Sequence, residues 1–383
     1  MNIAILAVRY FYPHKGYLEY YLARELAKLD NDVTVFTFKQ GKEISQQMID
    51  NFRVVYIPPV AKIHCCHNFG IRTASKIIKI IEENSPEVIH CQMLFDQLPL
   101  LLMRYQHRFN YKIVGNLLTQ EYFLDNTIQK IGFRLVKTLV KRYVKHKTSL
   151  FFAKTKELEE LLIGVFGISP RNIHIIPLGV DPDLFKFSQK ARYQIRDSLG
   201  LSDEDIVVVY SGKITPIKKL EILIEAIAPI IKENKNVNLL IIGEGEMSYL
   251  MYLKGLISRL RISKNVIFHH AVHRTLLPEF YSASDIAVWP GLSSISIVEA
   301  ASTNLPVIFR ATPAEIYAIE NKNGFVFEQG DKDGLRKYLN ILVHNEDLRK
   351  EMGCRSRLLV EQKLTWKSIA NRYLNSYMQI PNS

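Results

Sequence analysis

The sequence predicts an α/β protein built from two doubly wound domains, each with a mostly parallel sheet that helices cover on both faces. Strand-like apolar runs alternate with helical patterns along the whole chain, and this order is typical of parallel sheets. The length of 383 residues exceeds what one ordinary core holds, so two domains are expected. The alternation stops at Pro177–Ala191, where two prolines and a glycine precede a polar, charged stretch. We therefore expect domains over residues 1–183 and 184–360.

The first half opens with an apolar run that ends at Arg9. This run lacks the basic leader and cleavage site of a signal peptide, so it predicts a first strand. Strands are expected at Asn2–Val8, Asp32–Phe38, Arg53–Ile57, Val88–Cys91, Tyr111–Leu117, Ser149–Ala153 and Asn172–Ile176. Helices are expected at Tyr17–Leu29, Ile71–Glu83, Ile131–Lys145 and Lys156–Phe166.

The second half repeats the alternation. Strands are expected at Ile206–Ser211, Val237–Ile242, Val266–His269, Ile286–Trp289 and Val307–Phe309. Helices are expected at Lys219–Lys232, Met247–Leu260, Leu276–Ala283 and Ile297–Thr303, with another from Asp333. Two domains of this kind would place the carboxyl ends of their strands around one central cleft.

The most informative segment runs from Asp285 to Pro306. A buried strand stops at Pro290, a loop of small residues follows, and a helix opens near Ile297 with Glu299 in its first turn. Backbone N–H groups at a helix start suit a phosphate, and a carboxylate one turn further can accept hydrogen bonds from a ribose diol. The segment therefore indicates a sugar nucleotide, although a strand, a turn and a capped helix also occur in any α/β domain.

The formal net charge of +12 implies an anionic partner, which could be nucleic acid, a membrane face or a phosphorylated substrate. No interleaving of basic and aromatic residues supports nucleic acid, and no G-x-G-x-x-G follows the first strand as a dinucleotide oxidoreductase requires. The four cysteines, Cys65, Cys66, Cys91 and Cys354, give neither a metal-binding spacing nor a disulfide framework. We therefore expect a protein of the reducing cytosol with no metal, no cofactor and no membrane-spanning segment.

Several short motifs occur together in one order and spacing. They are Pro177–Asp181 with Phe185, Ser211–Lys219, the turn Gly243–Gly245, Glu299 with Ala300, Leu305–Ile308, and the terminal segment Trp366–Tyr377. In these motifs nearly the whole chain resembles the GT-B glycosyltransferases of the family 4 (group 1) type. The resemblance implies two Rossmann-like domains that face a central cleft. It also implies that the first domain binds the acceptor and is completed by residues 361–383, and that the second binds a nucleotide-sugar.

The resemblance assigns the donor site mainly to the second domain. Lys213 and Lys218 would hold the donor diphosphate and stabilise the charge that it gains as the glycosidic bond breaks. Glu299 would bind the ribose, and its replacement by alanine should weaken donor binding and leave the fold intact. Further donor contacts are expected from Gly16, Gly212, Glu244, Ser293, Ser294 and Ser296. The alternatives are a solvated loop for the lysines and helix capping for the serines.

The chain departs from the family pattern at three positions. Gly291 stands where the first glutamate of the E-x7-E motif is expected, Tyr17 replaces a second glycine after Gly16, and Leu118 stands where a histidine often faces the acceptor. The remaining acceptor candidates are His90, Gln92, Gln120 and Glu121. A buried, hydrogen-bonded histidine is the alternative for His90, and a solvated charge is the alternative for Glu121.

Positive charge is concentrated between Arg104 and Lys147, where ten Lys or Arg residues accompany only two acidic residues. On the helix expected there, one face carries basic residues and the other carries apolar residues such as Leu135. The basic face consists of Arg134, Lys137, Lys141 and Lys145. It predicts a surface that rests on an anionic membrane, and a core-packed helix with solvated lysines is the alternative.

These features predict a cytosolic or membrane-peripheral glycosyltransferase that moves a sugar from a nucleotide-sugar to a hydroxyl of a glycan or lipid-linked acceptor. The resemblance implies retention of anomeric configuration without a metal ion or a protein nucleophile. The missing glutamate, histidine and glycine leave an alternative, which is a degenerate relative that binds nucleotide-sugar or glycan without turnover.

Overall fold

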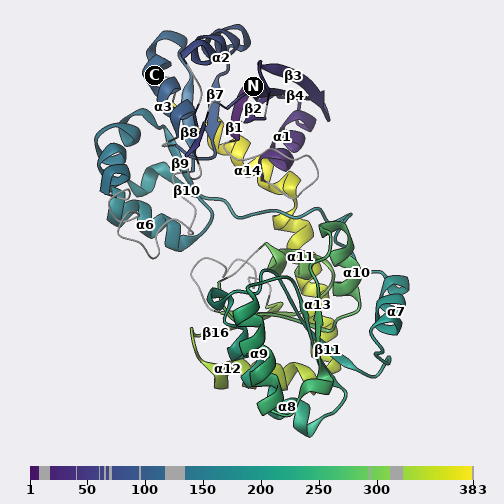
Figure 1. Cartoon of the computed structure of the whole chain (residues 1–383). Helices are drawn as coiled ribbons and strands as arrows, with labels where there is room; N and C mark the ends of the chain where they lie inside the picture. The colour runs from purple at the N-terminus through teal and green to yellow at the C-terminus, as the bar shows by residue number, and fades with distance from the viewer. Residues whose placement is uncertain are drawn as a thin grey trace. The chain divides into compact units, whose positions relative to one another are not determined.

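The computed structural model describes residues 1–7, 18–39, 41–59, 61–63, 66–68, 71–94, 96–116, 134–292, 295–310 and 322–381. The chain divides into two compact units (Figure 1). The first comprises Met1–Leu178 with Trp366–Ser383, and the second comprises Gly179–Thr365. The chain therefore passes between the units twice. Inside the second unit, Val180 next to the first passage donates its N–H to the Leu364 carbonyl oxygen at 2.9 Å.

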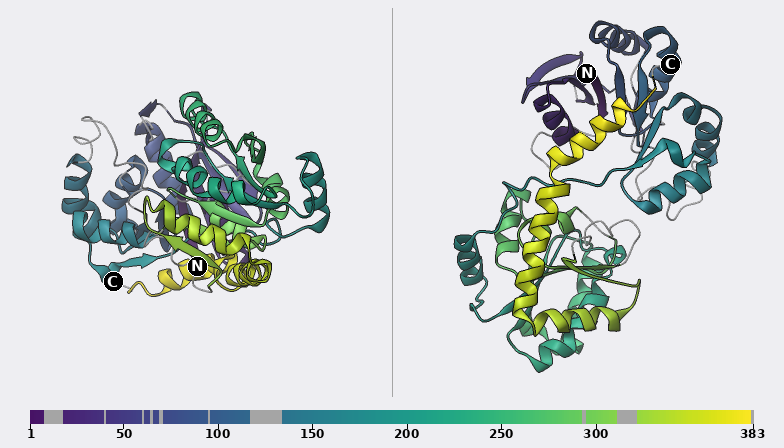
Figure 2. Two further views of the ribbon diagram at one scale, coloured as in Figure 1. Left: turned by 90° about the horizontal axis from the view of Figure 1, so that it is seen from below. Right: turned by 180° about the vertical axis from the view of Figure 1, so that it is seen from behind.

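The first unit contains an eight-stranded sheet in the described residues, with the order β10-β9-β8-β7-β1-β2-β4-β3. Its strands are β1 (Asn2–Ala7), β2 (Asp32–Phe38), β3 (Ser45–Ile49), β4 (Phe52–Ile57), β7 (Val88–Cys91), β8 (Lys112–Gly115), β9 (Leu150–Ala153) and β10 (Ile173–Ile175). Neighbouring strands are parallel except for the edge pair β3 and β4. The early strands of this sheet are the purple arrows beside the N-terminus in the right view of Figure 2. A separate antiparallel pair consists of β5 (Ala61–Ile63) and β6 (Cys66–Asn68).

The helices of the first unit are α1 (Leu18–Lys28), α2 (Ile71–Asn84), α3 (Gln97–Phe109), α6 (Lys156–Phe166) and the terminal α14 (Trp366–Met378). Of these, α2, α3 and α6 share one apolar core with the strands, and α1 packs against α14, where the Tyr21 ring stacks on Trp366. The sequence patterns did not predict α3, which Asp96 caps and which carries Pro99 near its start. A proline is tolerated there because the first N–H groups of a helix have no partner within it.

The basic segment of the first unit is helical over residues 134–139, passes through the π-helical turn η2 (Val140–Val144) and ends in α5 (Lys145–Lys147). A π-turn contains more residues than an α-turn, so the side chains that follow it are rotated relative to α-helical spacing. Among the described residues, no helix combines the length and apolar character that a membrane crossing needs.

The second unit contains a parallel six-stranded sheet in the described residues, with the order β13-β12-β11-β14-β15-β16. Its strands are β11 (Ile206–Ser211), β12 (Val237–Ile242), β13 (Val266–His269), β14 (Ile286–Trp289), β15 (Val307–Arg310) and β16 (Gly324–Phe327). Its helices are α7 (Gln189–Ser198), α8 (Leu220–Glu233), α9 (Met247–Arg259), α10 (Leu277–Ser282), α11 (Ser296–Ser302), α12 (Lys332–Val343) and α13 (Glu346–Leu359). Helices lie on both faces of this sheet (Figure 1), so the predicted α/β architecture is confirmed.

Among the parallel strands of each sheet, the strand order reverses once. The reversal lies between β1 and β7 in the first unit and between β11 and β14 in the second. In open α/β sheets, ligands bind outside the carboxyl ends of the strands at such a switch point. A ligand of the second unit is therefore expected at the loops after β11 and β14.

Candidate functional site

The loop after β11 is built against the loop after β12. Gly212, at φ 144°, makes the bend out of β11, and the Ile214 N–H donates to the Glu244 carbonyl oxygen at 2.8 Å. Gly245 is needed in this contact, because a Cβ there would overlap the Ile214 backbone. The Gly-x-Gly turn thus allows close backbone packing, and the Glu244 side chain is exposed.

Lys213 and Lys218 occupy different environments in the loop after β11. Lys213 is exposed, and within the described residues its ammonium has no hydrogen bond or ion pair. Lys218, in the short turn η4 (Pro216–Lys218), donates from Nζ to the Leu292 carbonyl oxygen at 2.7 Å. Leu292 in turn donates its N–H to the Ile217 carbonyl oxygen at 3.1 Å. Lys213 is therefore the cation that an anionic ligand could reach, whereas Lys218 joins the two loops at the switch point.

The backbone packed around Gly291 explains why this position holds no glutamate. A Cβ at residue 291 would overlap the carbonyl oxygen of Ile217 and the backbone of Lys218. A larger residue would therefore force the loop after β11 to move. The departure from the E-x7-E pattern at this residue is part of the packing between the loops after β11 and β14.

Glu299 lies inside the second unit and does not face solvent. Its side chain is 2% exposed, and Arg274, in the turn η6 (Arg274–Leu276), donates from Nε to its Oε1 at 2.8 Å. The Arg274 guanidinium also lies over the Phe185 ring, 4.9 Å from the ring centre. Burial raises the pKa of the Glu299 carboxyl, and the charge of Arg274 opposes this shift. Glu299 is buried and does not face an open site, so we expect Glu299→Ala to destabilise the second unit, because Arg274 would lose its buried partner.

Arg274 was not singled out from the sequence. Its signal there is modest, since it is a basic residue a few positions after β13, at the same edge of the sheet as Glu299. Only the packing of η6 against α11 shows that the two side chains meet.

Ser296 begins α11 and is buried. The Tyr281 hydroxyl hydrogen-bonds Ser296 and also contacts the Ser211 Oγ at 2.6 Å. The Ser211 carbonyl oxygen accepts a hydrogen bond from Trp289 Nε1 at 3.0 Å. Ser296 therefore belongs to a buried polar network at the ends of β11 and β14.

Five of the predicted site residues lie outside the described residues, and their contacts stay predictions. They are the donor candidates Gly16, Ser293 and Ser294 and the acceptor candidates Gln120 and Glu121.

His90, on β7, lies in the core of the first unit. It is 2% exposed, its Nδ1 is 2.7 Å from the Tyr377 hydroxyl, and its ring stacks on Phe152 with the ring centres 5.4 Å apart. Burial, with a smaller contribution from the charge of Lys154, lowers the pKa of His90 to about 3. His90 is therefore a buried, hydrogen-bonded histidine, which was the alternative to an acceptor-binding residue. Gln92, just after β7, is half-buried at the carboxyl edge of the sheet.

A histidine held neutral in the core makes the first unit sensitive to acid. Folded His90 stays unprotonated down to about pH 3, whereas a histidine in an unfolded chain takes up a proton near pH ~6.5. The unfolded state therefore binds more protons between these values, and stability is lost as the pH falls through this window. Between about pH 6 and about pH 4, we expect the different protonation of His90 in the folded and unfolded states to lower the free energy of unfolding by about 2–3 kcal/mol.

Denaturant unfolding followed by the fluorescence of Trp366 measures this effect in a Trp289→Phe background. Trp289 and Trp366 are the two tryptophans of the chain, and Trp366 belongs to the first unit. His90→Phe keeps an aromatic ring and removes the proton site, so its stability should depend less steeply on pH. If the free energy of unfolding falls equally steeply with decreasing pH when His90 is present and in His90→Phe, His90 does not carry the acid sensitivity.

Asn116 is a candidate that the sequence patterns did not indicate. It follows β8 at the carboxyl edge, where its N–H donates to the Cys91 carbonyl oxygen at 2.9 Å and its carbonyl oxygen accepts from the Leu94 N–H at 3.0 Å. The residue is 5% exposed, and in the described part of the chain neither atom of its side-chain amide has a hydrogen-bond partner. Buried amides are seldom left unsatisfied, so Asn116 is suited to bind a ligand hydroxyl.

The basic helix agrees in part with the faces expected from the sequence. Val140 and Val144 are fully buried, and Arg134, Lys141 and Arg142 are exposed, whereas Lys137 and Lys145 are half-buried. Arg142 lies within the π-turn η2, and Lys145 directly follows it. Leu135, expected on the apolar face, is 68% exposed.

Comparison with known proteins connects both units to one family. HepE of Anabaena, solved in complex with UDP, superposes with a TM-score of 0.75 at 18% identity, covering 99% of this chain and 100% of that one. The description "Glycosyl transferases group 1" matches residues 191–358, and "Glycosyltransferase Family 4" matches residues 19–184. The chain belongs to the GT-B glycosyltransferases of the group 1, family 4 type.

Curated relatives of this glycosyltransferase chain are distant. The D-inositol 3-phosphate glycosyltransferase of Xylanimonas cellulosilytica is 25% identical over 237 residues, which are 59% of this chain and 56% of the relative. The alpha-monoglucosyldiacylglycerol synthase of Streptococcus pneumoniae is 23% identical over 339 residues, 86% of this chain and 75% of that protein. With three of the curated relatives, the match spans between 49% and 58% of their length.

Proposed function

We propose that this glycosyltransferase chain transfers a sugar from a nucleotide-sugar to a hydroxyl group of a glycan or lipid-linked acceptor. The observation that carries the proposal is the exposed ammonium of Lys213 at the switch point of the second unit. A cation fixed at this edge can stabilise the negative charge that develops on a departing nucleoside diphosphate. The UDP in the HepE structure supports the donor class, and the name of the pneumococcal relative supports a lipid-linked acceptor.

In the proposed reaction, the bond between the anomeric carbon and the diphosphate oxygen breaks while the acceptor oxygen bonds to the same carbon. The proton of the acceptor hydroxyl goes to the leaving diphosphate on the same face of the sugar, so configuration is retained. This route needs no protein nucleophile and no metal ion, because Lys213 supplies the positive charge. Asn116 is placed at the carboxyl edge of the first sheet, where an acceptor hydroxyl is expected.

A thermal-shift screen with UDP-, GDP-, ADP- and TDP-sugars tests the donor assignment. A ligand present at about 100 times its dissociation constant should stabilise the folded protein by roughly 2.7 kcal/mol. The stabilisation should shrink in Lys213→Gln and stay the same in Lys232→Gln, which removes an exposed charge from α8 in the same unit. If no nucleotide-sugar stabilises the protein, the donor assignment fails.

A second candidate is a relative that binds nucleotide-sugar or glycan without turnover. The closed position at Gly291 and the use of the Lys218 ammonium within the protein favour it, because both remove groups that would act on the donor. Release of nucleoside diphosphate separates the two candidates, since a binding protein would stabilise with the donor and release none.

We also propose that the basic helix of the first unit lies on an anionic membrane on the cytoplasmic side. Exposed Arg134 is adjacent to the exposed Leu135, and exposed Lys141 and Arg142 follow in the same helical segment. An apolar side chain near cations suits the interface of an anionic bilayer. Each basic residue near such a surface contributes ~1 kcal/mol. The half-buried Lys137 and Lys145 of the originally expected face contribute less in this arrangement.

The chain should therefore sediment with vesicles that contain phosphatidylserine and not with phosphatidylcholine vesicles, and added salt should weaken this binding. Replacing Arg134, Lys141 and Arg142 with Gln should abolish the binding. The matched control replaces three exposed lysines of α1 and α2, namely Lys28, Lys76 and Lys79. An equal loss of vesicle binding in the control variant would show that net charge alone, and not the basic helix, causes the binding. Equal binding of the wild type to both kinds of vesicle would also contradict the proposal.

A further inference from the structure

A pocket of about 610 Å³ lies in the first unit, away from the switch point of its sheet. Lys112 and Leu150 are the first residues of β8 and β9, and Asn172 directly precedes β10. These three residues all line the pocket. Because neighbouring parallel strands begin at the same edge, the pocket lies at the amino edge of the sheet, opposite to the edge where a family ligand is expected.

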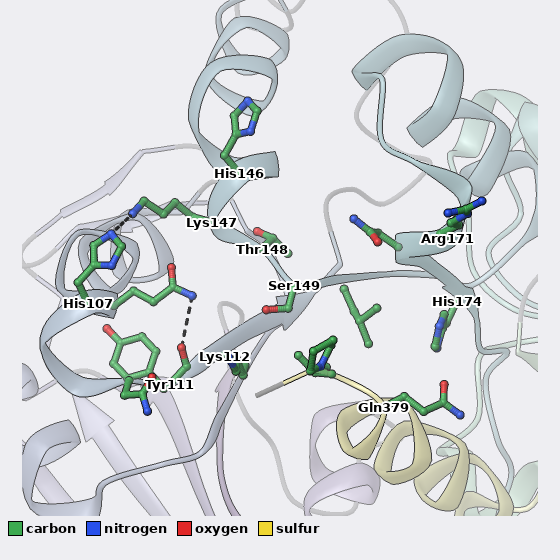
Figure 3. Close-up of a pocket in the computed structure, with 16 residues that line it drawn as sticks. His107, Tyr111, Lys112, His146, Lys147, Thr148, Ser149, Arg171, His174 and Gln379 are labelled. Carbon is green, nitrogen blue, oxygen red and sulfur yellow. Dashed lines mark hydrogen bonds between the residues drawn. The ribbon is translucent and has the colours of Figure 1, made fainter. Parts of the chain in front are cut away.

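The lining of this pocket is strongly basic (Figure 3). Its basic side chains are Lys112, Lys147, Arg171, His107, His146 and His174. All sixteen lining residues are described, and none of them is an aspartate or a glutamate. A concave site whose described lining carries cations and no carboxylate side chain favours an anionic ligand.

Two of the cations have no carboxylate partner in the described part of the chain. Lys147 Nζ lies 2.7 Å from His107 Nε2, and since an ammonium only donates, this ring nitrogen is the unprotonated acceptor. Arg171, in the turn η3 (Pro170–Asn172), is exposed and forms no ion pair among the described residues. Figure 3 shows Lys147 with His107 on one side of the pocket and Arg171 with His174 on the other.

His174 is held in one orientation by α14. Its Nδ1 lies 2.7 Å from the Ser376 Oγ, and the Ser376 hydroxyl donates its single proton to the Arg372 carbonyl oxygen at 2.9 Å. The Ser376 oxygen must therefore accept from the His174 Nδ1–H. This leaves Nε2 of His174 as the ring nitrogen outside that hydrogen bond and available to a ligand.

Neutral polar side chains complete the lining. Amides of Gln106, Asn110, Asn172 and Gln379 and the hydroxyl of Ser149 are among the lining residues. Amides and hydroxyls both donate and accept, as recognition of a polyol requires. The volume is also within the range of sites for small organic molecules, and it is larger than an inorganic phosphate needs.

We propose that this pocket binds a phosphorylated sugar or polyol, with the phosphate on its cations and the hydroxyls on its amides. The ligand can come from two sources, a soluble sugar phosphate or the headgroup of a phosphorylated inositol lipid. The pocket lies at the amino edge of the first sheet, whereas the donor site lies at the carboxyl edge of the second sheet. Ligand binding in the pocket therefore does not require transfer activity.

Calorimetric titration of the full chain with glucose 6-phosphate, and with glucose as the uncharged control, tests the soluble source. Sedimentation with phosphatidylcholine vesicles containing phosphatidylinositol 4-phosphate, against phosphatidylserine vesicles of equal charge, tests the lipid source. The pocket variant is Lys147→Gln with Arg171→Gln. The matched control is Arg104→Gln, an exposed arginine of α3 outside the lining. Lys213→Gln reports binding at the donor site.

We expect one of the two phosphorylated probes to bind, glucose and phosphatidylserine to bind more weakly, and the pocket variant to lose at least about tenfold in affinity. Arg104→Gln and Lys213→Gln should bind as the wild type does. Binding of glucose 6-phosphate alone identifies a soluble ligand, and binding of the inositol lipid alone identifies a headgroup. Binding of neither probe, equal affinity of the pocket variant and Arg104→Gln, or a loss only in Lys213→Gln would each overturn the proposal.

Discussion

Lys213→Ala is expected to slow the release of nucleoside diphosphate from the preferred nucleotide-sugar by about 10²–10³-fold, which is the usual cost of removing one group that stabilises developing charge. The melting temperature should not change, because the ammonium is exposed and has no partner within the described residues. A coupled assay for the released diphosphate measures the rate, and a thermal scan measures the stability.

Two further lysines serve as controls for Lys213. Lys232→Ala removes an exposed charge from α8 and should change neither rate nor stability. Lys218→Ala removes the hydrogen bond to the Leu292 carbonyl oxygen, so it should lower both quantities. If Lys213→Ala and Lys232→Ala release diphosphate equally fast, the diphosphate does not bind beside Lys213.

Glu299→Ala should destabilise the second unit by about 3–5 kcal/mol, because it leaves the Arg274 guanidinium without its buried carboxylate. The side chains are 2% exposed for Glu299 and 15% exposed for Arg274, so water compensates little for the lost partner. Unfolding followed by the fluorescence of Trp289, in a Trp366→Phe background, reports the second unit.

An exposed pair and a double replacement test whether burial causes this loss. Glu346→Ala removes an exposed partner of Lys350, 2.7 Å away, and should leave the transition unchanged. Glu299→Leu combined with Arg274→Met replaces the pair with apolar side chains and should recover part of the stability that Glu299→Ala loses. A Glu299→Ala protein as stable as the wild type would show that the ion pair contributes nothing.

Sequence patterns predicted best the elements whose side chains are buried on both faces. β11, β12 and β14 are continuous apolar runs in the core of a parallel sheet, and such runs have few other interpretations. β3 was not predicted, because its residues are mostly exposed and pair only with β4 at an edge. α13 was not predicted either, since most of its residues are polar and its buried positions are few.

The candidate site was less predictable because its side chains acquire their roles from distant contacts. His90 looked like an acceptor residue at a strand end, and the Tyr377 hydroxyl, 287 positions later, shows that it belongs to the core. Arg274 and Glu299 meet only when η6 packs on α11. Gly291 looked like a missing glutamate until the Ile217 and Lys218 backbones showed that no side chain fits there.

Release of nucleoside diphosphate by the wild-type chain tests the central claim most directly. The purified protein is incubated with UDP-, GDP-, ADP- and TDP-sugars, with Lys213→Ala as the matched blank. We expect at least one donor that stabilises the wild type also to yield free nucleoside diphosphate, with little or none from Lys213→Ala. A donor that stabilises the wild type and yields no diphosphate above the level of a protein-free blank, with or without added glycan or glycolipid acceptors, would contradict a transferase and leave a binding protein.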